Sequence, residues 1–237
     1  FKVLEKESEF NLFDAKFYAG HSLGEYSALC CADSINFEQT IELLKSRGKA
    51  MQNAMPNGEG GMMAILGADI ETINEIFKEN NQLQCYVAND NSAGQIVVSG
   101  KTSSLHKLEN LLTEKKIKFV KLPVSAPFHS PLMRNATLEM QNKINDAIFS
   151  NPKVNIISNV TANPENKSEN IKQLLIQQIE KPVRWRESVI NMINHGINRF
   201  IEIGPGKVLS GLVKRIDRNV KLNQVNNLED VKNIFND

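Results

Sequence analysis

The feature that most constrains the fold is the run Gly20-His21-Ser22-Leu23-Gly24. It follows residues 16–20, which predict a short buried strand, and it opens a helix predicted over 23–32. A Gly-x-Ser-x-Gly run at such a junction is typical of a nucleophile elbow, a strained turn that exposes the serine Oγ. The two glycines let neighbouring backbone pass without a Cβ clash. We therefore predict an α/β fold with Ser22 as a nucleophile; the simpler alternative is that Ser22 only caps the helix.

The remaining segments predict a sheet domain that is interrupted by a second unit. From Met62 to Leu122 the expected order is strand, helix, strand, strand, helix, strand, which is typical of a ferredoxin-like subdomain. After Ser130 helices and strands alternate again, which implies a mostly parallel sheet. We expect residues 1–57 and 127–237 to form a discontinuous α/β core, and residues 58–126 to form the inserted subdomain. The expected strands are 62–66, 85–88, 95–99, 117–122, 154–158 and 199–203, with a turn at 89–94, and the expected helices are about 36–55, 70–80, 103–116, 131–149, 171–179, 183–195 and 206–218.

Composition excludes several classes of protein. The formal net charge of +1 argues against nucleic-acid binding, which usually needs a strong basic excess. Basic clusters at 115–121 and 207–218 indicate solvated surface, with docking of an acidic partner as the alternative. No apolar run approaches the ~20 residues of a membrane-spanning helix. Three cysteines form neither a paired framework nor a metal spacing. We therefore expect no metal site and a cytoplasmic location, or an organelle interior if an upstream targeting segment is missing.

A serine nucleophile needs a base, and the chain has four histidines. His21 lies in the tight turn itself and is poorly placed to reach the Ser22 hydroxyl. His106 is expected on the surface of the subdomain, and His195 near a helix end, where capping explains it. His129 lies in the loop where the subdomain rejoins the core, and binding clefts commonly form at such junctions. We predict that His129 is the base.

Arg47 is the third residue that carries chemical information. It borders the apolar stripe of the helix over 36–55. Its planar guanidinium could receive a carboxylate in two charge-assisted hydrogen bonds of ~1.5–3 kcal/mol each, which would favour a carboxylated acyl group. It could equally point outward or pair with a structural glutamate, and the residue pattern leaves both readings open. The Leu23 N–H, at a helix start, is the natural donor to an oxyanion.

Together these residues resemble one family, the malonyl-CoA:acyl-carrier-protein transacylases. The resemblance runs from about Lys16 to Arg218 and implies a hydrolase-like α/β core with a ferredoxin-like insert. It rests on five ordered motifs, which are Gly-His-Ser-Leu-Gly-Glu at 20–25, Arg-Gly-Lys-Ala-Met-Gln at 47–52, Gly-Gln-Ile-Val-Val-Ser-Gly at 94–100, Ser-Ala-Pro-Phe-His-Ser at 125–130 and Glu-Ile-Gly-Pro-Gly-Lys at 202–207.

The resemblance implies an acyl transfer through a malonyl-serine, in fatty acid biosynthesis. Ser22 would attack the malonyl thioester while His129 takes its proton, and the Leu23 N–H would hold the oxyanion. Arg47 would hold the malonyl carboxylate. The phosphopantetheine thiol of acyl carrier protein would then attack the malonyl-serine, with His129 again as base. No cofactor, nucleic acid or membrane is implied, and we expect a free-standing monomer.

Three further positions follow from the resemblance alone. Gln178 matches a family position in the active-site wall that supports the histidine. Asn91 matches a pocket position. Phe128 resembles the bulky residue of malonyl-selective members, which leaves little room for a branched methylmalonyl group.

The sequence departs from the family pattern in two places. Full-length members carry an upstream strand and a Gly-Gln-Gly-Ser-Gln loop, whose glutamine backbone supplies a second oxyanion donor, and these 237 residues lack that run. The second departure is Asp33, which stands where relatives often have a helix-ending glycine; aspartate tolerates the left-handed conformation.

Two other functions stay open at this stage. An esterase of the α/β-hydrolase kind would place an acid and then a histidine on late loops, would have no use for Arg47, and would cleave neutral esters with water. A non-catalytic module that docks a carrier protein would form no malonyl adduct on Ser22.

The missing loop leads to the first prediction. Because loss of one oxyanion donor typically lowers the rate ~10²–10³-fold, we expect this chain to be inactive by itself and to gain malonyl transfer when extended upstream. The measurement is transfer from malonyl-CoA to acyl carrier protein by both chains. Equal rates would contradict it.

Overall fold

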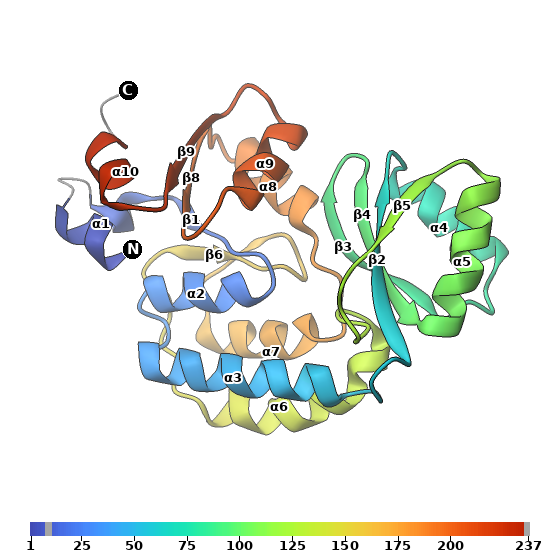
Figure 1. The fold of residues 1–237 in the computed structure, drawn as a ribbon. Coiled ribbons are helices and arrows are strands. Elements are labelled where there is room, and N and C mark those ends of the chain that lie inside the picture. Colours follow the sequence, from blue (N-terminus) through green and yellow to red (C-terminus); the bar gives the residue numbers. More distant parts are fainter. Residues whose placement is uncertain (8–10, 235–237) are drawn as a thin grey trace.

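The computed structural model describes residues 1–7 and 11–234, and its strands form three separate sheets among them (Figure 1). The sheet orders are β1-β6-β7, β3-β4-β2-β5 and β8-β9. This is a mixed α/β fold. No helix in the described part of the chain is long and apolar enough to cross a membrane.

A four-stranded sheet and two helices lie within residues 60–121. Every neighbouring strand pair in it is antiparallel. Apolar side chains of the sheet, including Ile65 and Val98, pack against Ile73 of α4 and Leu108 of α5, and all four are buried. The elements are β2 (Gly60–Leu66), α4 (Ile70–Glu79), β3 (Cys85–Ser92), β4 (Gln95–Lys101), α5 (Thr102–Glu114) and β5 (Lys118–Lys121). The predicted order of strands and helices is confirmed.

The turn predicted at 89–94 is wrong in its bounds. β3 continues to Ser92, with register shifts between Val87 and Asn89 and between Asp90 and Ser92, so only residues 93–94 turn. The polar run stays in the sheet because it faces the other part of the chain. The Asp90 N–H donates to the Val183 carbonyl, and the Val183 N–H donates to the carbonyl of Ala88.

Parallel pairing, expected of one sheet, is found in two. β1 (Phe17–Tyr18) pairs parallel with β6 (Asn155–Ile157), and β8 (Arg199–Ile203) pairs parallel with β9 (Lys221–Val225). β7 (Pro164–Glu165) adds an antiparallel edge to β6. The patterning of the sequence did not predict β7 or β9, which are short and half exposed.

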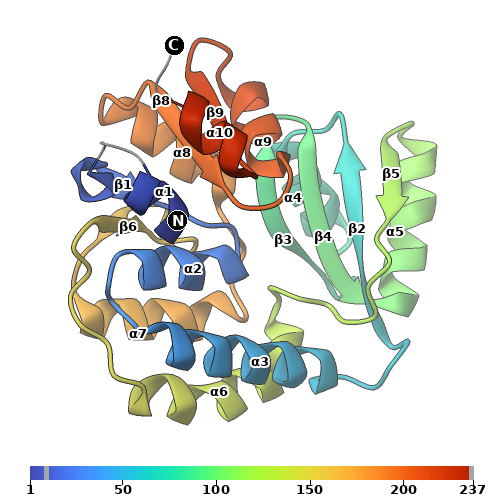
Figure 2. The same cartoon turned by 60° about the vertical axis from the view of Figure 1, so that its left-hand side comes forward.

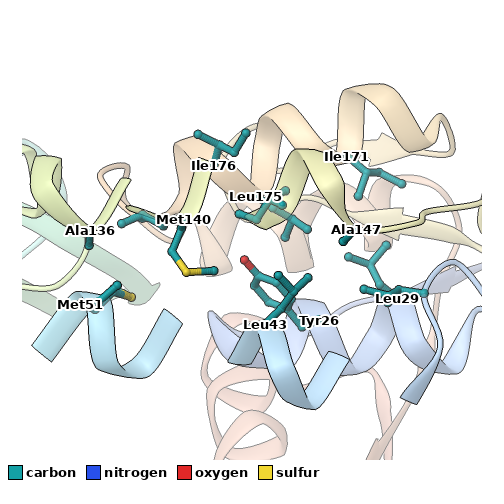
Figure 3. Packing of buried hydrophobic residues seen from close by; sticks show 14 of the residues in the cluster. Tyr26, Leu29, Leu43, Met51, Ala136, Met140, Ala147, Ile171, Leu175 and Ile176 are labelled. Atoms are coloured by element: carbon teal, nitrogen blue, oxygen red, sulfur yellow. The ribbon is translucent and has the colours of Figure 1, made fainter. Parts of the chain in front are cut away.

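Four helices build the main core below the first sheet. Figure 2 shows them stacked on one side of the molecule, opposite the four-stranded sheet. Their facing side chains interdigitate: Tyr26 lies beside Leu43, and Leu29 lies near Ala147, all four buried (Figure 3). The helices are α2 (Leu23–Cys31), α3 (Phe37–Asn53), α6 (Arg134–Asp146) and α7 (Ser168–Gln178).

The remaining helices flank the β8-β9 pair. α8 (Trp185–Asn194) and α9 (Val208–Ile216) pack through a cluster that includes Val189 and Leu212. α1 (Lys2–Glu7) lies beside α10 (Leu228–Asn233), with Leu4 and Val231 in one buried group (Figure 1). Short 3₁₀ turns occur at Leu12–Asp14 and Pro131–Met133.

In the turn between β1 and α2, the backbone of Gly20 packs directly against the backbone of Gly24. Ser22 has φ 52° and ψ −107°, which is strained for a residue with a side chain. A Cβ on Gly20 would lie 2.0 Å from the carbonyl carbon and oxygen of Gly24, so only glycine fits there. A Cβ on Gly24 would have nothing within 4 Å, so the close approach needs one glycine rather than two. At Asp33, φ is 56°, the left-handed conformation expected there.

This asymmetry gives a matched pair of variants. Gly20→Ala is expected to disrupt the turn and lower the unfolding midpoint sharply, because its methyl group overlaps rigid backbone. Gly24→Ala adds a methyl group in open space within a helix and is expected to be neutral or to stabilise by ~0.5–1 kcal/mol. Denaturant unfolding of both variants measures this, and similar midpoints for the two would contradict it.

Candidate active site

Three polar side chains from distant parts of the chain meet at Ser22. The serine follows β1, His129 lies in the loop after the four-stranded unit, and Arg47 projects from α3. Ser22 Oγ lies 2.8 Å from His129 Nε2 and 3.0 Å from Arg47 Nη2. Ser22 makes no side-chain cap to α2, so the simpler reading of this serine as a helix cap is wrong.

The imidazole of His129 is buried and held between two hydrogen-bond partners. Its Nδ1 lies 2.8 Å from the carbonyl oxygen of Gln178. A carbonyl can only accept, so Nδ1 carries the proton and Nε2 presents its lone pair to the Ser22 hydroxyl. Burial, reinforced by the Arg47 cation, lowers the pKa of His129 to about 3. The imidazole is therefore uncharged and able to accept a proton at neutral pH.

Arg47 is a buried cation directed at the Ser22 hydroxyl. Its side chain is 6% exposed, and Nη2 also donates to Gln178 Oε1 at 2.8 Å. No carboxylate in the described residues lies within 4.0 Å of the guanidinium, and its Nε has no hydrogen-bond acceptor there. Burial lowers the pKa of Arg47. The outward-pointing and glutamate-paired readings are therefore wrong, and the charge is available to an anionic group.

Gln178 connects these residues at the end of α7. Its side chain is fully buried, and Nε2 donates to the Ser22 carbonyl at 3.1 Å and to Glu25 Oε2 at 2.7 Å. Its side-chain oxygen thus holds Arg47, while its main-chain oxygen holds His129.

The other predicted positions lie around this centre without contacting Ser22 Oγ. Asn91 Oδ1 lies 2.8 Å from His21 Nε2 and is buried. Phe128 is half-buried and packs on the edges of two apolar clusters. The Leu23 N–H opens α2, where no intrahelical acceptor exists, so it is free to donate into the site.

The other three histidines do not contact the Ser22 hydroxyl, as expected. His21 contacts Asn91, and His106 is exposed on α5. His195 caps α8, with Nδ1 2.8 Å from the Asn191 carbonyl. In the described ranges no three His, Cys, Asp or Glu side chains are grouped so as to hold a metal ion.

Two buried polar residues were missed from the sequence. Glu25 lies under the elbow, and burial raises its pKa to about 7. Asn159 follows β6 and is 1% exposed. The sequence held an indication of each residue. Glu25 ends the motif at 20–25, and Asn159 follows a predicted strand whose carboxyl end lies beside that of β1.

Comparison with known proteins agrees with this geometry. A family model described as an acyl transferase domain matches residues 14–230. The malonyl CoA-acyl carrier protein transacylase of Bacillus subtilis is 41% identical over 235 residues, which cover 97% of this chain and 73% of that protein. The transacylase of Staphylococcus aureus strain MSSA476 is 41% identical over 221 residues, covering 91% and 71%.

Solved structures match over nearly the whole chain. The acyl-carrier-protein-S-malonyltransferase of Bartonella henselae superposes with a TM-score of 0.94 at 41% identity, covering 99% of this chain and 75% of that one. A malonyl-transacylase solved in complex with its type II polyketide synthase acyl-carrier protein has a TM-score of 0.93 at 35% identity, covering 99% and 76%. The chain therefore belongs to the acyl transferase domain family and, within it, to the malonyl-CoA:acyl carrier protein transacylases.

Proposed function

We propose that this chain, when extended upstream as in the first prediction, moves a malonyl group from coenzyme A to the phosphopantetheine thiol of acyl carrier protein through a malonyl ester on Ser22. The observation that carries the proposal is the position of Ser22 Oγ, within hydrogen-bond distance of both a neutral imidazole and a buried guanidinium. The carrier protein as acceptor is supported by the likeness to a transacylase solved with its carrier protein.

In the first half-reaction, Ser22 Oγ attacks the thioester carbonyl as its proton passes to His129 Nε2. The Leu23 N–H stabilises the oxyanion of the tetrahedral intermediate. When the intermediate collapses, the carbon–sulfur bond breaks, and the imidazolium returns the proton to the departing coenzyme A thiolate. The Gln178 carbonyl keeps the histidine in the required tautomer and orientation throughout.

In the second half-reaction, the carrier-protein thiol gives its proton to His129 and attacks the ester carbon. The Ser22 oxygen leaves and regains the proton from the imidazolium. Arg47 pairs with the malonyl carboxylate in both halves, and its unpartnered Nε supplies a donor beside Nη2. Gln178 Oε1 keeps the guanidinium on the nucleophile's side of α3.

Two pocket residues complete the proposed site. Asn91 extends it onto β3 through its contact with His21. Phe128, next to the base, would limit space for a branched acyl group.

The proposed architecture is a hydrolase-like core of residues 1–57 and 127–237 with a ferredoxin-like insert at 58–126, which the separate apolar clusters support. The monomeric state and cytoplasmic location stay predictions.

The esterase alternative fits the site less well. His129 Nδ1 contacts a main-chain carbonyl rather than the carboxylate of a hydrolase triad. A buried arginine beside the nucleophile would also disfavour neutral esters. A docking module, in turn, would not need a strained serine aligned with a base.

Removing the guanidinium tests the substrate class. Arg47→Ala is expected to lower kcat/KM for malonyl-CoA at least ~100-fold and to leave acetyl-CoA unchanged or improved, because only malonyl has a carboxylate to lose. Both rates are measured by mass spectrometry as formation of the acyl-Ser22 adduct. The upstream-extended chain is used, because the 237-residue chain is expected to form the adduct slowly. Lys49→Ala, an exposed cation on the same helix, is the control. Equal losses on both thioesters would refute the role of Arg47.

The pH dependence of acylation tests the base. With the pKa of His129 held to about 3, the rate of malonyl-Ser22 formation is expected to stay level from pH 7 to pH 5. A histidine with the ordinary pKa of 6.5 would be mostly protonated at pH 5, which would slow the reaction about 20-fold. Quenched-flow mass spectrometry of the adduct measures the rate, with Ser22→Ala as background. An acid limb centred near pH 6.5 would overturn this picture.

A further inference from the structure

Asn159 closes across the turn that presents the nucleophile. Its side-chain Oδ1 accepts from the Ser22 N–H at 2.7 Å, and its Nδ2 donates to the Gly20 carbonyl at 2.8 Å. One planar amide thus satisfies backbone groups on both sides of His21. These are the groups of the strained residue and of the glycine on which the close backbone approach depends.

The position of Asn159 follows from the sheet. β1 and β6 are parallel neighbours, so their carboxyl ends lie at the same edge. Ser22 follows one strand and Asn159 follows the other, within two to four residues of the strand ends.

Asn159 is itself held from two directions. Its N–H donates to Glu25 Oε2 at 3.1 Å, and Glu25 Oε2 also accepts from Gln178 Nε2. Its carbonyl accepts from the Arg184 N–H at 2.9 Å. The carboxylate of Glu25 therefore joins the turn to the residue that holds Arg47 and His129.

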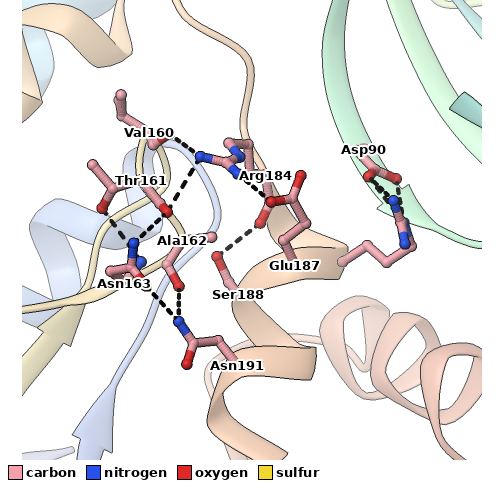
Figure 4. A network of polar contacts seen from close by, with 10 residues as sticks. Asp90, Val160, Thr161, Ala162, Asn163, Arg184, Glu187, Ser188 and Asn191 are labelled. Atoms are coloured by element: carbon pink, nitrogen blue, oxygen red, sulfur yellow. Dashed lines mark hydrogen bonds and ion pairs between the residues drawn. The ribbon is translucent and has the colours of Figure 1, made fainter. Parts of the chain in front are cut away.

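The rest of this loop, residues 158–163, is fastened to α8. Arg184 Nη1 donates to the carbonyls of Val160 and Thr161, and Asn191 Nδ2 donates to the carbonyl of Ala162 at 2.8 Å (Figure 4). Ala162 has φ 58°, a conformation that needs such support. The same helix carries Arg186, which binds the Asp90 carboxylate of the four-stranded unit.

We propose that Asn159 is a positioning residue for acyl transfer: its amide holds the backbone of Ser22 so that Oγ points at His129 and Arg47, and Glu25 holds Asn159 in turn. The inference rests on Ser22 being the nucleophile. An amide serves at every pH, because the site needs one acceptor and one donor on the same planar group. An ionised aspartate there would put an oxygen against the Gly20 carbonyl.

The first experiment uses the upstream-extended protein, labels Ser22 with a serine-reactive fluorophosphonate and follows the adduct by mass spectrometry, alongside malonyl transfer. Asn159→Ala is expected to slow both at least 100-fold while the KM for malonyl-CoA stays within twofold, because Arg47 keeps its place. Asn166→Ala, at an exposed asparagine farther along the chain, is the matched control and is expected to keep the wild-type rates. An Asn159→Ala protein that labels within threefold of wild type would overturn the proposal.

A second variant decides the question if Asn159→Ala does not fold. Asn159→Asp keeps the size and the acceptor for the Ser22 N–H, and it regains a donor only when protonated. Burial disfavours its ionisation, and so does the Glu25 carboxyl group on the adjoining N–H once Glu25 is itself ionised, whereas the Arg47 cation favours it. The labelling rate of Asn159→Asp, divided by that of wild type at each pH, is expected to fall at least tenfold from pH 5 to pH 8. A ratio close to one at every pH would overturn the proposal.

The two proposals fail in different ways. Upstream-extended wild-type protein that takes neither the fluorophosphonate nor malonyl on Ser22 would refute the proposed function itself. Labelling of wild type with undiminished labelling of both Asn159 variants would refute only the positioning role.

Discussion

The strained backbone of Ser22 is the constraint on which the rest of the site depends. A residue with a side chain at φ 52° and ψ −107° costs of order 1–3 kcal/mol and persists only where surrounding contacts enforce it. Here they are the close approach of Gly20 to Gly24 and the hydrogen bonds of Asn159 to the turn. Released from these contacts, the serine would relax to an ordinary conformation, and Oγ would lose its alignment with His129.

Burial then gives the surrounding groups their chemistry. The imidazole of His129 and the guanidinium of Arg47 both contact the Ser22 Oγ. Their burial has a different effect on each group. Desolvation keeps the histidine neutral and able to take a proton. It also strengthens the attraction of the arginine for an anionic acyl group, because a charge interacts more strongly where water is excluded. Gln178 makes both arrangements compatible, since its two oxygens serve the two residues separately.

The accuracy with which the sequence predicts local structure differs from one segment to the next. The apolar stripe of α3 and the strand–helix order of the four-stranded unit are local patterns, and both were predicted with small errors at their ends. The run at 89–94 was misassigned because polar residues in a strand imitate a turn when their buried partner is far away in sequence. Gln178 has no local signal and came from the family resemblance alone.

The sequence by itself determined the strand, turn and helix around Ser22 and indicated Ser22 and His129 as the candidate nucleophile and base, because glycine spacing and strand-to-helix periodicity are encoded within a few residues. Tertiary structure alone decided that Arg47 faces inward, that Gln178 serves it and His129 together, and that Asn159 and Glu25 lie beneath Ser22. The physical reason is that these contacts join residues 25 to 139 positions apart, and parallel strand pairing and helix packing bring them together.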